Sequence, residues 1–232
     1  MLSGNVGTGK TISAVHYAMG SDNVLANFKL RDHPNYLRLM KEHIISSSSE
    51  VPEGCRKAIV EKKVNWPFWR EHQNCDVFLD EIHNIMSSRT AMSRQNILMS
   101  EWLSQIRKIW GSSGDANYLR YLRRMNNINF NKVFQKVLNR SRNVWFITQK
   151  PRKVDVNVRE LCHLYIECNK IEIVKDDKKH VVVVNDVWFG DTNYDAIEMR
   201  ELGVKPKRCY FYANHYFKNY DSYEIIGAEG YL

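Results

Sequence analysis

The sequence lacks the features that mark membrane, secreted and disulfide-rich proteins. Its 232 residues contain no apolar run near the ~18 residues that a membrane span requires. The chain opens on a glycine-rich segment instead of the apolar stretch of a secretory signal. The five cysteines form no C-x-x-C pair and no regular disulfide spacing. We therefore expect a protein without a membrane span that works in a reducing, intracellular compartment.

Internal repeats and low-complexity tails are also absent, and the composition fits a globular domain. Apolar residues make up 44% of the chain, which is enough for a sizeable core. At this length we expect one domain over residues 1–232 that carries a substantial insertion. Cys162, His163 and Cys168 could be drawn as metal ligands, but the apolar segment around them favours buried side chains on a strand.

Acidic residues are almost missing from one stretch of the chain. Between residues 105 and 142, Asp115 is the only acid among nine basic residues, so this stretch alone carries the +8 of the whole chain. Aromatic and amide side chains are interleaved with the basic ones. Such a patch is typical of a polyanion partner, although a solvated basic helix is the alternative for charge alone. The basic residues are Arg107, Lys108, Arg120, Arg123, Arg124, Lys132, Lys136, Arg140 and Arg142.

A complete phosphate-loop pattern, G-x-x-x-x-G-K-[ST], occupies residues 4–11. Its glycines let backbone N–H groups approach phosphate oxygens, Lys10 reaches the β- and γ-phosphates, and the Thr11 hydroxyl ligates Mg²⁺. An amphipathic helix expected directly after the loop would point its positive end at the nucleotide, which argues against a chance glycine-rich turn. The predicted nucleotide-binding residues are Gly4, Asn5, Val6, Gly7, Thr8, Gly9, Lys10 and Thr11, with ATP and Mg²⁺ as the ligands.

The position of this loop is unusual. Only Met1, Leu2 and Ser3 precede it, whereas a phosphate loop normally leaves a buried strand of about five or six residues. Either the natural chain starts further upstream or this central strand is unusually short, and the sequence leaves both alternatives open.

Hydrophobic periodicity predicts strands that alternate with helices early in the chain and mainly strands late. We expect strands at 23–28, 75–79, 144–148, 164–168, 171–174, 180–187 and 208–213. Helices are expected at 34–45, 93–110, 118–125 and 130–138, and a loop at 46–54. The aromatic cluster at 66–69 is expected to pack in the core, with base stacking as the alternative. This order favours an α/β fold whose mixed sheet has a parallel centre.

A second motif adds hydrolysis to nucleotide binding. The apolar strand at 75–79 ends in Asp80 and Glu81. Asp80 is placed to hold the Mg²⁺ shell opposite Thr11, and Glu81 to polarise the attacking water as general base or water orienter. His83 follows closely, and we expect it to be a solvent-facing or capping residue without a catalytic role.

The strand at 144–148 adds a third element, because it ends at Gln149. A side-chain amide at this tip can contact the γ-phosphate or the lytic water and report whether phosphate is present. Arg140 and Arg142 lie just before the same strand, and an arginine supplied to a neighbour's γ-phosphate accelerates hydrolysis by ~10³–10⁵. Either could be such a finger; a DNA-phosphate contact or plain surface charge is the alternative.

The order of these motifs resembles the FtsK–HerA superfamily of ring ATPases. The segments that carry the resemblance are residues 4–11, 76–84 and 139–159, the last with its Thr-Gln strand tip and trailing Val-Asp and Val-Arg pairs. Within the superfamily, the pattern is most similar to genome-packaging ATPases of archaeal viruses and to Zot-like phage proteins. Residues 216–224 also resemble the tail of archaeal virus and plasmid members.

The resemblance implies a RecA-like P-loop NTPase fold, a three-layer α/β/α arrangement, that assembles into a ring, usually a hexamer, and pumps DNA through its pore. It implies that Lys10 and Thr11 bind nucleotide and that Gln149 is the sensor. It also implies that Asp80 holds the metal and that Glu81 activates water. The trans-acting arginine carries over to Arg140 or Arg142, with Arg159 as a further candidate. Residues 111–138 depart from the family pattern as a basic helical insertion, for which we predict DNA contacts through Arg120, Arg123, Arg124, Lys132 and Lys136.

Our interpretation is a Mg²⁺-dependent ATPase that translocates double-stranded DNA into a viral capsid. It would work in the host-cell cytoplasm and transiently at the virion, with a capsid or portal-vertex protein as a further partner. One alternative is a secretion, conjugation or Zot-like phage morphogenesis ATPase that extrudes single-stranded DNA. Another is a nucleotide-gated scaffold that binds nucleic acid with little turnover. A small-molecule kinase is a distant third alternative, because it has no use for the basic insertion or for Gln149.

Overall fold

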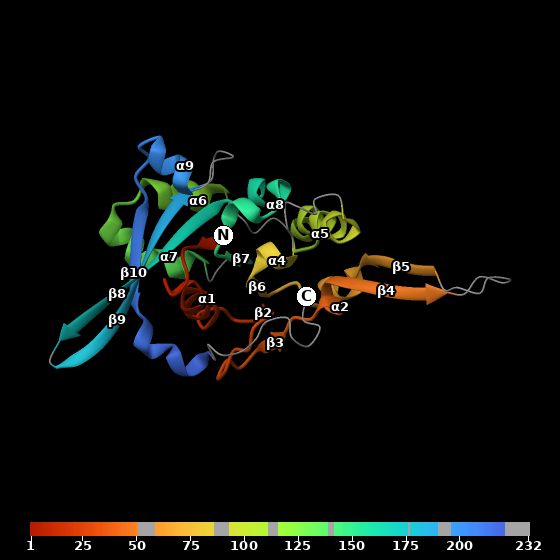
Figure 1. Cartoon of the computed structure of the whole chain (residues 1–232), viewed down its shortest axis with the longest axis horizontal. Coiled ribbons are helices and arrows are strands. Elements are labelled where there is room, and N and C mark those ends of the chain that lie inside the picture. Colours follow the sequence, from red (N-terminus) through yellow and green to blue (C-terminus); the bar gives the residue numbers. More distant parts are fainter. Residues whose placement is uncertain are drawn as a thin grey trace.

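The computed structural model describes residues 1–50, 59–85, 93–110, 116–138, 142–175, 177–189 and 196–220. These residues form an eight-stranded sheet with helices on both faces, and a separate two-stranded ribbon that projects from the body (Figure 1). The loops that carry the predicted nucleotide-binding residues follow strands of the large sheet.

The large sheet has the strand order β10-β9-β8-β1-β7-β6-β2-β3. Every pair from β8 to β3 is parallel, whereas β9 pairs antiparallel with both β8 and β10. The mixed sheet with a parallel centre that the sequence predicts is therefore confirmed. The bounds are β1 (Leu2–Ser3), β2 (Val24–Ala26), β3 (Tyr36–Arg38), β6 (Asp76–Leu79), β7 (Val144–Thr148), β8 (Leu164–Lys175), β9 (Lys178–Phe189) and β10 (Lys207–Tyr212).

The first strand is short but central. Leu2 is fully buried and pairs in parallel register with Ile147 of β7 on one side and Ile166 of β8 on the other. The N–H of Ile166 also donates to the Met1 carbonyl oxygen at 2.8 Å. Two paired residues are thus enough to place the start of the phosphate loop between β7 and β8.

Two hydrophobic cores lie on the two faces of the sheet, because successive strand residues alternate between them. Val77 and Leu79 of β6 belong to one core, and Phe78 between them belongs to the other. The first core includes side chains of α3 (Trp66–Glu71), α4 (Ile82–Ile85), α5 (Arg94–Trp110), α8 (Val156–Glu160) and α9 (Ala196–Glu201). The second includes α1 (Lys10–Ala18), α6 (Ala116–Arg124) and α7 (Asn127–Leu138). The three-layer α/β/α arrangement is confirmed.

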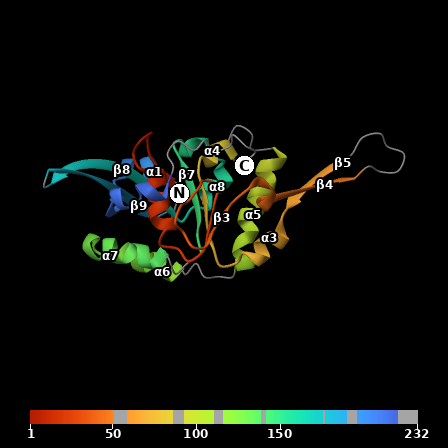
Figure 2. The same cartoon turned by 90° about the horizontal axis from the view of Figure 1, so that it is seen from below.

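The basic helices α6 and α7 sit on the α1 side of the sheet, away from α3 and α5 (Figure 2). Phe130 and Phe134 of α7 stack at 4.6 Å between ring centroids and are buried. Between the two helices, the Met125 carbonyl oxygen accepts a hydrogen bond from Lys207 Nζ at 2.6 Å, which ties the pair to the start of β10.

Two local predictions are wrong. Residues 34–45 were expected to form one helix, but they contain β3 and the four-residue α2 (Lys41–Ile44), because residues 36–38 pair with β2 instead. Residues 46–54 were expected to form a loop, but residues 46–50 belong to β4 (Ile45–Glu50), which pairs with β5 (Ile59–Val64) in the projecting ribbon. Residues 51–54 lie outside the described part of the chain. The serines of β4 have low strand propensity, and cross-strand pairing supplies the order that propensity does not.

Other predictions are confirmed with small changes of boundary. The two late strands expected at 164–168 and 171–174 form a single strand, β8, and β9 pairs with it over its whole length. Trp69 is fully buried against Trp102 and Trp110, so the aromatic cluster packs in the core as expected. Short 3-10 turns follow at η2 (Pro151–Lys153), η3 (Ala213–His215) and η4 (Phe217–Asn219).

Candidate nucleotide site

The sheet order brings the three predicted motifs to one edge. Strand β7 lies between β1 and β6, and its register places Thr148 beside Ser3 and Phe146 beside Leu79. Because all three strands are parallel, the residues after them meet at their carboxyl ends, where ligands bind in open α/β sheets. The residues that directly follow β1, β6 and β7 are Gly4, Asp80 and Gln149.

The phosphate loop has the backbone that its glycines allow. Gly7 and Gly9 have φ of 76° and 95°, a region that residues with a Cβ rarely adopt. At Gly4, where φ is 148°, a Cβ would lie 2.8 Å from the carbonyl oxygen of Cys168 on β8. Inside the loop, Lys10 Nζ donates to the Asn5 carbonyl oxygen at 2.7 Å. Burial lowers the pKa of the Lys10 ammonium, and the Asp80 carboxylate opposes that shift.

Thr11 and Asp80 meet as the motif predicts. The Thr11 hydroxyl donates to Asp80 Oδ2 at 3.0 Å, and Asp80 is 3% exposed. Burial raises the pKa of Asp80 to about 6, so an added cation would favour its charged form. A hydroxyl and a carboxylate are the hard oxygen donors that Mg²⁺ prefers, and the pair fits that ion.

A residue that the sequence did not single out holds Asp80 in place. The side chain of Asn27, which follows β2, accepts from the Asp80 N–H at 2.7 Å and donates to the Asp80 carbonyl oxygen at 3.0 Å. Asn27 is fully buried, so both bonds are made out of water. No spacing in the sequence links Asn27 to Asp80, because the contact exists only when β2 and β6 pair.

Glu81 and Gln149 are in direct contact. Gln149 Nε2 donates to Glu81 Oε1 at 2.9 Å. Glu81 has φ of 54°, which is rare for a residue with a side chain and is found preferentially at functional sites. The candidate water-activating carboxylate and the candidate sensor therefore share one hydrogen bond at the carboxyl end of β7.

Comparison with known proteins identifies the family. A family model described as "Zonular occludens toxin (Zot)" matches residues 1–216. The chain belongs to the Zot family. A crystal structure of the N-terminal domain of zonular occludens toxin from Neisseria meningitidis aligns over 95% of this chain and 96% of that one, with 14% identity and a TM-score of 0.49. No curated protein matches.

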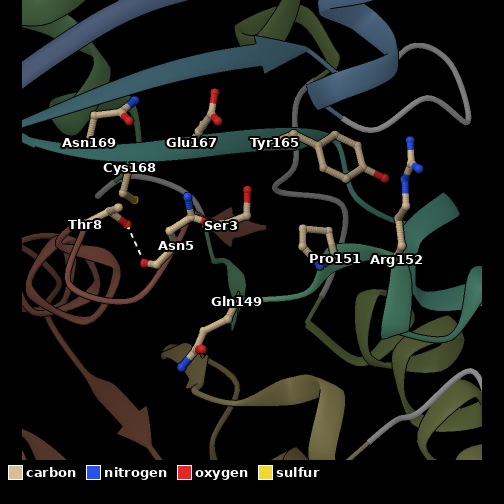
Figure 3. Close-up of a pocket in the computed structure, with 11 residues that line it drawn as sticks. Ser3, Asn5, Thr8, Gln149, Pro151, Arg152, Tyr165, Glu167, Cys168 and Asn169 are labelled. Carbon is tan, nitrogen blue, oxygen red and sulfur yellow. Dashed lines mark hydrogen bonds between the residues drawn. The ribbon is translucent and has the colours of Figure 1, made fainter.

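This Zot-family chain is a P-loop ATPase-like domain with a nucleotide-binding site. Its phosphate loop borders a pocket of about 150 Å³ that lies against β8 (Figure 3). Asn5 and Thr8 line it from the loop, and Gln149 and Arg152 line it from the segment after β7. The Gln149 side chain points away from Asn5 and Thr8 (Figure 3). Tyr165, Glu167 and Asn169 complete the wall along β8.

His83 is not the solvent-facing residue that we expected. Its side chain is 12% exposed, and Nδ1 lies 3.3 Å from Glu81 Oε2 and 3.0 Å from Thr148 Oγ1. Burial lowers the pKa of His83; the Glu81 charge opposes this, and Lys150, Lys153 and Lys10 add to it.

Of the candidate arginines, Arg142 lies away from the phosphate loop of its own chain. Arg142 precedes β7, at the edge of the sheet opposite Gln149, and its guanidinium donates to the carbonyl oxygen of Trp110. Arg140 lies outside the described residues. Arg159 is half-buried in α8. Cys168 is buried in β8, in agreement with the strand interpretation of its segment.

The predicted DNA-contacting side chains are all exposed on α6 and α7. They lie on the two helices that pack on the α1 side of the sheet, and we call them the basic surface. The end of α7 contacts the residue before β7, at the opposite end of that strand from Gln149. None of the helices in the described segments is long and apolar enough to cross a membrane. The exposed side chains are Arg120, Arg123, Arg124, Lys132 and Lys136.

Proposed function

We propose that this protein is a Mg²⁺-dependent ATPase that drives movement of phage DNA during virion morphogenesis. The observation that carries the proposal is the contact between Glu81 and Gln149 at the edge where the phosphate loop and Asp80 also lie. A nucleotide-binding module without turnover needs the loop but has no use for a carboxylate held beside it. The basic surface on α6 and α7 supports a polyanion as the moved substrate.

Each residue has a defined task in this mechanism. Lys10, which donates to Asn5 in this structure, would donate instead to phosphate oxygens. A magnesium ion held by Thr11 and Asp80 would supply charge neutralisation at those oxygens. Glu81 would take the proton of the attacking water, and the Gln149 amide would orient that water and register the loss of phosphate.

Membership of the Zot family favours the morphogenesis alternative over packaging into a capsid. Both versions are DNA-translocating ATPases, and both fit the placement in the FtsK–HerA superfamily that we propose from the motifs. The morphogenesis alternative, in which single-stranded DNA is extruded, predicts that single-stranded DNA stimulates ATP hydrolysis more strongly. The packaging version predicts stronger stimulation by duplex DNA and a capsid or portal-vertex partner.

The proposal includes a ring, because Arg142 lies at the opposite end of β7 from the phosphate loop of its own chain. A neighbouring copy would supply the trans-acting arginine from Arg142, Arg140 or Arg159, and a hexamer is the expected size. For Arg142 this requires the guanidinium to leave the Trp110 carbonyl oxygen when two copies meet.

Hydrolysis measured with and without DNA tests the proposal. Phosphate release is followed with ATP and Mg²⁺ alone, with single-stranded DNA and with duplex DNA of equal length, and solution mass is measured alongside. We expect stimulation by DNA and a mass above that of a monomer. A folded monomer whose slow turnover ignores DNA would contradict the proposal.

The variant Glu81→Gln isolates the chemical step. It should bind ATP normally and lose about 10²–10⁴-fold in turnover, because a positioned general base contributes that much. The control is Glu71→Gln at the exposed end of α3, which removes the same charge far from the loop. Near-normal hydrolysis by Glu81→Gln would favour the nucleotide-gated scaffold, in which the carboxylate has no catalytic task.

A further inference from the structure

The carboxylate of Glu81 is held from two sides. Oε1 accepts from Gln149 Nε2 at 2.9 Å, and Oε2 lies 3.3 Å from His83 Nδ1. The backbone of Glu81 is in a left-handed conformation, so its side chain leaves the chain in a direction that ordinary strand or helix geometry does not give. The two partners therefore decide where this carboxylate points.

The same nitrogen of His83 has a second oxygen neighbour. Thr148 Oγ1 lies 3.0 Å from Nδ1, and Thr148 Oγ1 also accepts from the backbone N–H of Lys150 at 3.1 Å. A neutral imidazole nitrogen carries either one proton or one lone pair. Nδ1 can therefore donate to Glu81 when protonated, or accept from the Thr148 hydroxyl when it is not. It cannot do both.

From this shared contact we propose that His83 is a positioning residue for Glu81. When Nδ1 carries the proton, it anchors Oε2 and fixes the direction of Oε1. When the Thr148 hydroxyl donates to Nδ1, the carboxylate loses that donor and is free to turn. The inference rests on the proposed function, because it assigns His83 to the carboxylate that activates water.

This contact connects Glu81 to a basic turn. Thr148 is the last residue of β7, and the segment after it carries the exposed side chains of Lys150, Arg152 and Lys153. If the turn changes and the Lys150 amide moves away from Thr148, the Thr148 hydroxyl loses the hydrogen bond from that amide. This loss changes whether the hydroxyl donates a hydrogen bond to His83 Nδ1. Gln149 lies within the same turn, so both partners of the Glu81 carboxylate respond to one segment.

His83 is suited to a test, because the hydrophobic core at α4 is formed by other side chains. In α4, Ile82 is fully buried and Ile85 is 6% exposed, and these two side chains belong to the core. We expect a change of the His83 ring to leave both in place. A loss of activity can therefore be separated from a loss of folding by a thermal unfolding midpoint measured on each variant.

The experiment compares two variants. His83→Leu removes the donor, and His83→Asn keeps an N–H donor near the position of Nδ1. We expect His83→Leu to lower kcat by about 10²-fold, the cost of misplacing a reacting group by about 1 Å, while KM for ATP stays close to wild type. His83→Asn should recover most of that loss. Wild-type kcat in His83→Leu, or equal losses in two folded variants, would overturn the proposal.

A second readout does not depend on hydrolysis. The pKa of the His83 ring is measured by NMR titration in the wild type, in Glu81→Gln and in the control Glu71→Gln. The Glu81 charge raises the pKa of His83, so Glu81→Gln should lower it and Glu71→Gln should not. An unchanged pKa in Glu81→Gln would overturn the inference. If the pKa shifts but the wild type hydrolyses no ATP, the contact stands and the proposed function fails.

Discussion

Lowering the pH should destabilise the fold through His16 in the helix that follows the phosphate loop. The His16 ring stacks on Phe211 at 3.9 Å between centroids and meets the edge of Tyr216 at 4.9 Å. Its Nδ1 is buried without a hydrogen-bond partner in the described part of the structure. Burial lowers the pKa of His16 from its ordinary 6.5 to about 4.

The sign and size of the effect follow from that shift. Below pH 6.5 the unfolded chain binds a proton at His16 that the folded chain refuses until about pH 4, so unfolding becomes easier across this window. For a difference of this size, the contribution of His16 to the free energy of unfolding falls by about 2 kcal/mol between pH 7 and pH 5. Asp76 and Asp80 act in the opposite direction, because burial raises the pKa of each to about 6.

Because of this opposition, the effect must be read as a difference between two proteins. Urea unfolding of the wild type and of His16→Phe is measured at pH 7 and pH 5. The phenylalanine keeps the stacking on Phe211 and removes the titrating group. The variant should gain about 2 kcal/mol relative to wild type as the pH falls. His215→Phe at an exposed position is the control. Parallel pH profiles for wild type and His16→Phe would refute the reasoning.

Three further predictions concern the nucleotide edge and the basic surface. Gly4→Ala should weaken ATP binding and lower the unfolding midpoint more than Gly7→Ala, because only the first Cβ meets backbone, and equal effects in calorimetry would contradict this. Asn27→Ala should cost about 1–3 kcal/mol in urea unfolding and also reduce ATPase activity, whereas Asn23→Ala at an exposed contact should do neither. Charge reversal at Arg120, Arg123 and Arg124 should abolish DNA stimulation and flatten the salt dependence of DNA binding by about 0.9 in log–log slope for each DNA phosphate that the variant no longer neutralises. Reversal at Lys62, Lys63 and Arg70 is its control, and stimulation that survives the first set would show that α6 does not bind the DNA.

The parts of the site that the sequence predicts are those whose chemistry is local. The phosphate loop needs its glycines and its lysine within eight residues, and the structure shows positive φ at Gly4, Gly7 and Gly9. Asp80 and Gln149 were predictable because each directly follows an apolar strand. Parallel strands bring such residues to one edge whatever the length of chain between them.

Residues whose role depends on a neighbour in another strand were not predictable. Asn27 is an ordinary polar residue after a short strand until β2 pairs with β6 and its amide meets the Asp80 backbone. The surroundings of His83 were equally hidden, since nothing in the sequence places Thr148 beside it. The ribbon of β4 and β5 was missed for a related reason. A serine-rich segment forms a strand because it pairs with a partner strand and not because of its own propensity.

Strand β7 lies between the basic helices and Gln149 of the nucleotide site in the chain. At its start, Asn143 donates through Nδ2 to the Leu138 carbonyl oxygen at the end of α7 and to Asp76 Oδ1, each at 3.0 Å. At its end, Thr148 and Gln149 contact His83 and Glu81. The strand has five residues, four of them buried; its first three pair with β6, and its last two pair with β1. If the basic surface binds DNA as we propose, β7 is the connection in the chain between the end of α7 and the residues that contact Glu81.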